Sequence, residues 1–172
     1  MQKVRIIATG LLYLSRIIAI PYLATAIYCI ICFIFSSSMV HPFDEGKRFV
    51  IYYPFTQHRF LIGDEYSFLY IFEMISVIGL YGIFFWLLGN VFGIFRHQKL
   101  FTEKGVARLK VFYLLNFLAP LPYMLINLIY GYETSELFVI TVLHAVVGIF
   151  AYFMAVIFSR GLHLQQEQDL IF

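Results

Sequence analysis

Residues Leu137–Phe158 read LFVITVLHAVVGIFAYFMAVIF, an apolar stretch without a single Asp, Glu, Lys or Arg. A helix needs about 20 apolar residues to cross the hydrocarbon core of a bilayer, and this stretch provides them. Helices in the core of a soluble protein rarely run this far without a polar stripe. The stretch therefore predicts a membrane-spanning helix.

Three further stretches have the same character: Leu11–Phe35, Phe68–Phe95 and Val111–Tyr130. The chain is 62% hydrophobic and 13% charged, whereas a soluble domain carries about 25% charged residues. We expect an all-α integral membrane protein, folded as a single four-helix bundle over residues 1–172. The expected helices cover about 11–35, 68–95, 103–130 and 137–160, with an outside loop at 36–67 and a cytoplasmic tail at 161–172.

Lys and Arg residues fall mostly on alternate sides of these stretches. One side holds Lys3, Arg5, Arg16, Arg96, Lys99, Lys104, Arg108, Lys110 and Arg160, and the other holds only Lys47, Arg48 and Arg59. Cytoplasmic loops collect Lys and Arg, so both termini are expected in the cytoplasm. The net charge of +2 belongs to two separate membrane faces. It gives no reason to expect direct binding of nucleic acid.

The first stretch has a second interpretation, a cleaved signal peptide. Lys3 and Arg5 precede an apolar run, and Ala24-Thr25-Ala26 resembles a cleavage site. Because the apolar run continues to Phe35, an uncleaved first helix is the expectation.

Cys29 and Cys32 form a C-x-x-C pattern within this first stretch. The pattern can indicate redox or metal chemistry, but burial in hydrocarbon suppresses the reactive thiolate. We expect small packing residues, with no metal and no cofactor. The chain also lacks H-E-x-x-H, G-x-S-x-G and Gly-rich phosphate-loop motifs, so an enzyme is not expected.

The outside loop contains two short runs typical of β-strands, Phe49–Tyr53 and His58–Ile62. Pro54 separates them and Gly63 follows the second. A small β-hairpin lying on the outer helix ends is the prediction.

Small residues suggest how the helices pack. Gly79, Gly82, Gly89 and Gly93 share one face of the second helix, and Gly148, Ala151 and Ala155 lie on the fourth. Small residues allow helix backbones to approach closely within a membrane. We expect these two helices to touch, with a homodimer seam as the alternative.

Two local signals shape the third helix. Thr102 followed by Glu103 is typical of a helix start, because Thr caps the first turn and an acid there favours the helix dipole. Pro120 and Pro122 predict an interruption in the middle of the span.

Polar groups at membrane depth are candidates for function by default, because burying them in hydrocarbon is costly. Glu73, Asn127 and His144 fall at similar depth below the outer surface, at about 1.5 Å of helix rise per residue. Either they form a ligand or proton site, or they satisfy one another and fix helix packing. Arg16, Asn90 and Asn116 form a second polar layer near the inner boundary, where helix-to-helix hydrogen bonds explain them.

The end of the chain resembles a bacterial family of four-helix membrane proteins, the family of domain of unknown function 2975. The matching residues are Phe158, Arg160, Gly161, Leu164, Glu167, Asp169 and Leu170, together with Phe101, Arg108 and Leu109 in the loop before the third helix. Leu100, Gly105 and Ile171 depart from the family's pattern, which often has Pro, Asn and Thr there.

The resemblance implies a bacterial inner-membrane protein whose partner is a small cytosolic helix-turn-helix regulator. Partner docking would then involve the inner loop and the tail, with candidate residues Arg108, Leu164, Glu167, Asp169 and Leu170. The basic loop has a second interpretation, since juxtamembrane Lys and Arg also bind anionic lipids and set topology.

Three functions remain open. The first is a non-enzymatic membrane sensor that restrains or signals to a DNA-binding regulator. The second is a small transporter or immunity-type protein using Glu73 and His144, acting as a homodimer. The third is an accessory subunit of a larger membrane complex.

Overall fold

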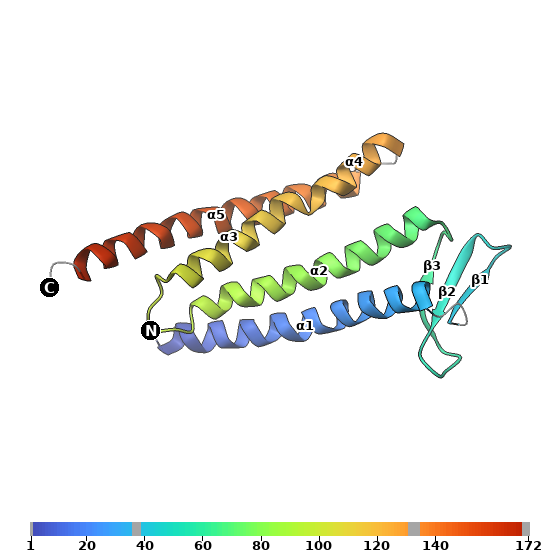
Figure 1. Cartoon of the computed structure of the whole chain (residues 1–172), viewed down its shortest axis with the longest axis horizontal. Coiled ribbons are helices and arrows are strands. Elements are labelled where there is room, and N and C mark those ends of the chain that lie inside the picture. Colours follow the sequence, from blue (N-terminus) through green and yellow to red (C-terminus); the bar gives the residue numbers. More distant parts are fainter. Residues whose placement is uncertain (1, 36–38, 131–134, 170–172) are drawn as a thin grey trace. The chain divides into compact units, whose positions relative to one another are not determined.

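The computed structural model describes residues 2–35, 39–130 and 135–169 of the chain (Figure 1). It is mostly helical, with a small sheet between the first two helices. The elements in chain order are α1 (Gln2–Phe35), β1 (Val40–Phe43), β2 (Arg48–Tyr52), β3 (Arg59–Gly63), α2 (Phe68–Ile94), α3 (Glu103–Leu118), α4 (Pro120–Tyr130) and α5 (Ser135–Asp169).

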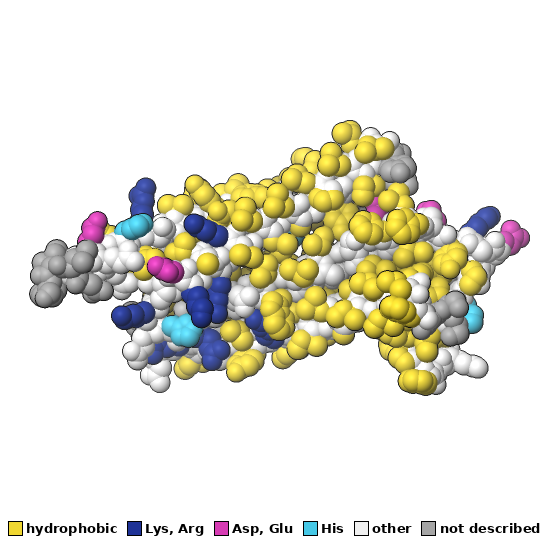
Figure 2. Space-filling view, viewed as in Figure 1, with side chains coloured by type: hydrophobic (Ala, Val, Ile, Leu, Met, Phe, Trp, Pro, Cys, Tyr) yellow, Lys and Arg dark blue, Asp and Glu magenta, His cyan; other side chains and the backbone are white. Residues whose placement is uncertain are grey.

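Four helical segments are long and apolar enough to cross a membrane: Gln2–Phe35, Phe68–Ile94, Glu103–Ile129 and Leu137–Gln168. No more than 22% of the most apolar window of any of them is buried. Apolar side chains therefore cover the outside of these helices (Figure 2). Such a surface is stable against hydrocarbon and costly against water.

Helix bounds differ from the expectation at two places. α1 begins at Gln2 rather than near residue 11 and continues through Pro21. α5 runs to Asp169, whereas the fourth helix was expected to end near residue 160. The added segment 162–169 consists mainly of Leu, Gln and Glu, which are strong helix formers even where the chain turns polar.

The third span is interrupted where the prolines predicted it. α3 ends at Leu118, α4 begins at Pro120, and Ala119 lies between them. Ala119 keeps helical dihedral angles. The interruption therefore comes from the missing N–H groups of Pro120 and Pro122, which remove hydrogen bonds from the ladder.

The sheet is an antiparallel meander of order β1-β2-β3. The predicted hairpin is confirmed as β2 and β3, which pair Ile51 with Leu61. β1 was not foreseen, so the small sheet corrects the all-α expectation. Its sequence Val-His-Pro-Phe lacks a β pattern, and Pro42 is tolerated because β1 is an edge strand.

The described chain divides into two compact units. Unit 1 comprises Met1–Ile17 and Phe84–Phe172, and unit 2 comprises Ile18–Ile83. The predicted bundle of all four helices remains a prediction, while the packing inside each unit is described below.

The core of unit 2 joins the sheet to the first helix. Cys29, Cys32, Val40, Phe49 and Ile51 form one buried cluster. Cys29 and Cys32 are therefore packing residues, as expected. The ring of Phe49 has no exposed surface and meets several neighbouring aromatic rings edge-on or tilted.

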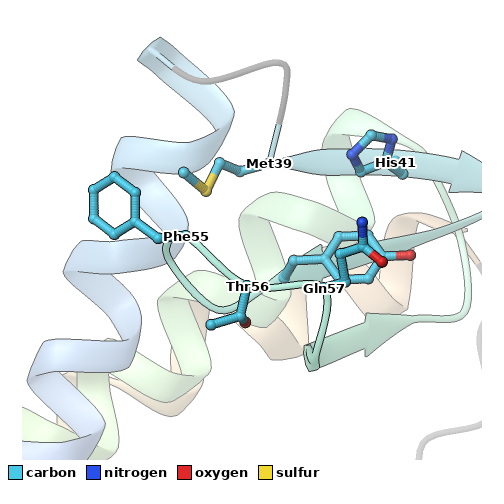
Figure 3. Close-up of a pocket in the computed structure, with 6 residues that line it drawn as sticks. Met39, His41, Phe55, Thr56 and Gln57 are labelled. Atoms are coloured by element: carbon cyan, nitrogen blue, oxygen red, sulfur yellow. The ribbon is translucent and has the colours of Figure 1, made fainter.

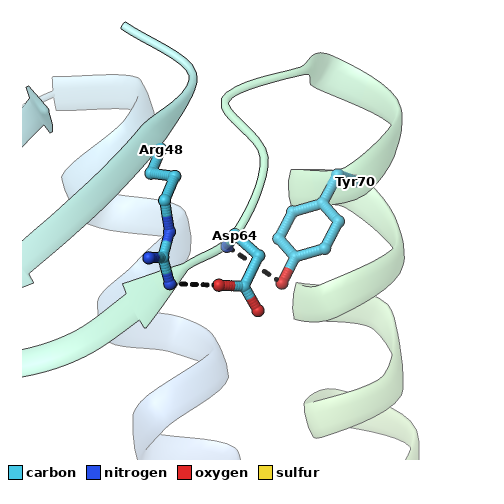
Figure 4. A network of polar contacts seen from close by, with 3 residues as sticks. All are labelled: Arg48, Asp64 and Tyr70. Atoms are coloured by element: carbon cyan, nitrogen blue, oxygen red, sulfur yellow. Dashed lines mark hydrogen bonds and ion pairs between the residues drawn. The ribbon is translucent and has the colours of Figure 1, made fainter. Parts of the chain in front are cut away.

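Polar contacts hold the same sheet to both of its helices. The Tyr28 hydroxyl of α1 donates a hydrogen bond to the carbonyl oxygen of Tyr52, at 2.5 Å. Arg48 of β2 forms an ion pair with Asp64, and the backbone N–H of Asp64 donates to the hydroxyl of Tyr70 on α2, at 3.2 Å (Figure 4). The sheet is thus fastened to the ends of α1 and α2.

The core of unit 1 gathers the end of α2, the start of α3 and the last part of α5. Ile94, Leu109, Ala155 and Phe158 are buried together with Val106. The Phe158 ring meets Phe95 and Phe101 edge-on, with centroids 5.8 and 5.3 Å away. The predicted cap is confirmed, since the Thr102 side chain accepts a hydrogen bond from the Gly105 N–H at 3.0 Å.

The glycines of α2 face α1. Within unit 1 the second and fourth helices do meet, as predicted, but through larger residues, since the Phe84 ring of α2 lies 5.5 Å from the His144 ring of α5. A Cβ atom on Gly79 would lie 3.6 Å from Ala26, and one on Gly82 would lie 2.8 Å from the Leu23 side chain. In unit 1, Gly89 faces Ser15 and Gly93 faces Leu12.

The small residues of α5 have other neighbours. Gly148 faces the Phe117 ring of α3, and Ala155 belongs to the unit 1 core. Ala151 is buried as well. Sequence spacing located the packing faces of both helices but did not identify which helix each face meets.

Replacing Gly82 by Ala tests the contact between α1 and α2. The new Cβ would lie 2.8 Å from Leu23 Cγ and 3.0 Å from the Leu23 backbone nitrogen. We expect Gly82→Ala to lower the free energy of unfolding by about 1–3 kcal/mol. Unfolding in mixed detergent micelles measures the change.

Gly10→Ala is the matched control, because a Cβ there has nothing within 4 Å. It should leave stability unchanged or raise it by up to about 1 kcal/mol, the helix preference of Ala over Gly. Equal destabilisation by both substitutions would contradict the packing described for Gly82.

Candidate functional site

An open cavity lies on the sheet of unit 2. It has a volume of about 570 Å³ and is lined by Met39, His41, Tyr52, Phe55, Thr56 and Gln57 (Figure 3). The rings of His41 and Tyr52 meet edge-on, 5.2 Å apart. The volume lies within the range of about 300–1,000 Å³ typical of small-molecule sites. The sequence predicts an outside loop at 36–67 but not this cavity. His41 of β1 forms part of the cavity wall, and β1 itself was not predicted.

Phe55 is the most unusual residue of the cavity. Its side chain is 99% exposed, and its φ of +59° lies in the left-handed region. This conformation costs a residue with a Cβ about 1–2 kcal/mol. The turn is held by hydrogen bonds from the Thr56 N–H and hydroxyl to the Tyr53 carbonyl oxygen. A ring displayed in this way is available to contact a ligand or the membrane interface.

His144 is paired with Asn116. Its Nδ1 lies 2.9 Å from Asn116 Oδ1, and its ring meets the Phe84 ring edge-on at 5.5 Å. Because an amide oxygen only accepts hydrogen bonds, Nδ1 carries the proton. The amide nitrogen of Asn116, a residue only 1% exposed, donates to the Phe112 carbonyl oxygen. Asn116 therefore ties α3 to α5.

The other two members of the predicted outer layer have different surroundings. Asn127 donates to the Tyr123 carbonyl oxygen of its own helix, at 2.9 Å. Glu73 belongs to unit 2, whereas Asn127 and His144 belong to unit 1. Among the described residues, Glu73 Oε1 is buried and has no hydrogen-bond partner. A joint site of Glu73, Asn127 and His144 remains a prediction.

Arg16 lies near the middle of α1 and is held by residues of α2. Its Nη2 donates to Asn90 Oδ1 at 2.6 Å, and its guanidinium carbon lies 3.4 Å from the centre of the Trp86 ring. A desolvated cation over an indole contributes about 2 kcal/mol. Arg16 and Asn90 therefore fasten α1 to α2, as expected for the inner layer, whereas Asn116 makes a different contact.

The proposed docking residues occupy different surroundings. Leu164 is 61% exposed and Glu167 is exposed, both on the polar extension of α5. Arg108 is half-buried, and its Nη1 would lie 3.5 Å from a Cβ on Gly93. Asp169 ends α5, and Leu170 lies outside the described residues. Leu164 and Glu167 are thus free to meet a partner.

Comparison with models of known protein families, with characterised proteins and with solved structures finds no match. Within the part of the chain that the structure describes, no three His, Cys, Asp or Glu side chains form a group able to hold a metal ion.

The pairing of His144 can be tested by a double-mutant cycle. We expect Asn116→Ala and His144→Phe to couple by about 0.6–1.7 kcal/mol, the range for hydrogen bonds between membrane helices. Unfolding in mixed micelles gives the four free energies. The parallel cycle with Asn127→Ala should show coupling near zero. Larger coupling to Asn127 than to Asn116 would contradict the contact described.

Proposed function

We propose that this chain is a multi-pass membrane protein without catalytic activity that reports an outside event to a cytosolic regulator. Its four apolar helical segments support insertion in a membrane. In this proposal the sheet of unit 2 receives the signal. The inner loop and the end of α5 then pass it to a partner.

Charge supports the orientation. Lys and Arg side chains gather at the end of unit 1 where α1 begins and α5 ends (Figure 2). The positive-inside rule favours a cytoplasmic position for this end, and therefore for both termini. The family resemblance supports the bacterial inner membrane as the location.

The cavity on the sheet supports the proposal that unit 2 receives the signal by binding a ligand. Its lining combines the exposed Phe55 ring with the imidazole of His41, the Thr56 hydroxyl and the Gln57 amide. An apolar wall with a few polar groups is the usual composition of a ligand site. These apolar and polar groups suit either a peptide or a lipid headgroup as the ligand.

One observation carries the output half of the proposal: α5 continues as a helix to Asp169, well beyond its apolar stretch. Its base is packed, because Gly161 lies against the Phe101 ring of the inner loop and Phe158 meets the same ring. Leu164 and Glu167, three residues apart, share one face of this extension. A helical face with an apolar anchor and a charge is a common way to bind a partner.

Family resemblance supplies the identity of the partner, a small helix-turn-helix regulator. Binding at α5 would hold such a regulator at the membrane and away from DNA. A change at the sheet would release it by altering how α1 and α2 present the inner loop.

Glu73 favours a second candidate, a proton or ion pathway. An acidic group at membrane depth with a buried, unpartnered oxygen is a functional candidate. The two candidates differ in one respect: a pathway needs flux through liposomes that Glu73→Gln abolishes, whereas a sensor needs no flux.

Photocrosslinking in cells tests the proposed output face. A photoreactive amino acid at Leu164 should crosslink to a small DNA-binding protein, and Glu167→Lys should weaken that product by about tenfold, the effect of 1.4 kcal/mol. The same probe at Gln166, on the opposite side of the helix, is the control. Equal products at both positions, or a product lacking any DNA-binding domain, would contradict the proposal.

A further inference from the structure

A groove in unit 1 lies on the α3–α5 pair. Its cavity has a volume of about 290 Å³ and is lined mainly by Lys110, Tyr113, Tyr152, Val156, Ser159 and Arg160. α3 and α5 form the most extensive helix contact of this unit, so the groove is part of a packed pair.

The groove has a charged end and an apolar end. Lys110 lies in the middle of α3, about two turns from its first residue. Arg160 lies near the end of the apolar part of α5. Both side chains are exposed, and neither forms an ion pair with any described residue. Two like charges that share one small cavity repel each other, and an anion between them would remove that repulsion.

Aromatic rings form the deeper end. Tyr113 lies one helical turn beyond Lys110, and Tyr152 lies two turns before Arg160, at about 1.5 Å per residue. Their rings meet edge-on with centroids 5.5 Å apart. Phe153 and Ile157 on the neighbouring surface of α5 are exposed, so this end continues into the apolar surface that faces lipid.

We infer that this groove binds one anionic phospholipid of the cytoplasmic leaflet. The phosphate lies between Lys110 and Arg160 and accepts a hydrogen bond from the Ser159 hydroxyl. The upper parts of the acyl chains lie against Tyr113, Tyr152 and Val156. The inference rests on the proposed membrane location and does not depend on signalling.

Size and charge favour a lipid over a protein segment. A helix with side chains is about 10–12 Å wide, and a cavity of about 290 Å³ cannot hold one. The volume suits a phosphate with the adjoining glycerol. Basic pockets between helices on the cytoplasmic side bind lipid headgroups, with each Lys or Arg giving about fivefold preference for an anionic surface. Two cations therefore predict a preference of about 30-fold.

Native mass spectrometry of the detergent-purified full chain tests this directly. Phosphatidylglycerol and phosphatidylcholine are added separately, and the concentrations giving half occupancy of one bound lipid are compared. Wild type should hold phosphatidylglycerol at about 30-fold lower concentration. Lys110→Ala with Arg160→Ala should reduce this ratio to about onefold, and Lys110→Arg with Arg160→Lys should preserve most of it.

Arg96→Ala with Lys104→Ala is the matched control, because it removes two exposed cations from the same end of unit 1 but outside the groove. It should keep the 30-fold ratio. Val156→Trp fills the cavity and leaves both cations in place, so it should abolish the retained lipid. If the double alanine variant fails to fold, this variant still shows whether the cavity holds the lipid.

Three results would overturn the inference: equal binding of both lipids by wild type, an equal loss of preference in the control, or lipid retention by Val156→Trp. A wrong membrane assignment would give a different result, because the chain would then stay dissolved without detergent before any lipid is added. Failure of the signalling proposal leaves the lipid ratio unchanged.

Discussion

In the proposed membrane location, backbone hydrogen bonding in hydrocarbon is the constraint on which the rest of this structure depends. Every N–H and C=O group at membrane depth needs a partner within the chain, and a helix provides one. This explains why irregular and extended backbone concentrates at the helix ends. It also explains why the interruption at Ala119, between α3 and α4, keeps helical dihedral angles. The helices can then expose apolar side chains, because the surrounding lipid is itself apolar.

Within this constraint, a few inward-facing aromatic residues organise both units. Phe49 seats the sheet on α1 beside Cys29 and Cys32, and Phe158 joins the inner loop to α5. Polar contacts are used sparingly and in defined pairs, such as Arg16 with Asn90 and His144 with Asn116. Each pair joins two helices, which is the expected use of a polar group where desolvation is costly.

The sequence predicts the four apolar helices, the β2–β3 hairpin and the Thr102 cap, because each depends on local pattern. It does not predict β1, since Pro42 and His41 hide a short edge strand that only pairing with β2 stabilises. Nor does it predict which helix a glycine face meets, because spacing fixes the face but not the neighbour. Nor does the sequence predict that His144 pairs with Asn116, because residue spacing within one helix does not show which side chain of another helix lies opposite.

Sidedness of the chain is the central claim, and cysteine labelling in intact cells tests it most directly. Gln57→Cys on the sheet and Gln166→Cys on α5 are both exposed positions, while the native Cys29 and Cys32 are buried and give the background. A membrane-impermeant maleimide should label Gln57→Cys in intact cells and Gln166→Cys only after permeabilisation. Labelling of both positions in intact cells, or of Gln166→Cys alone, would contradict the account.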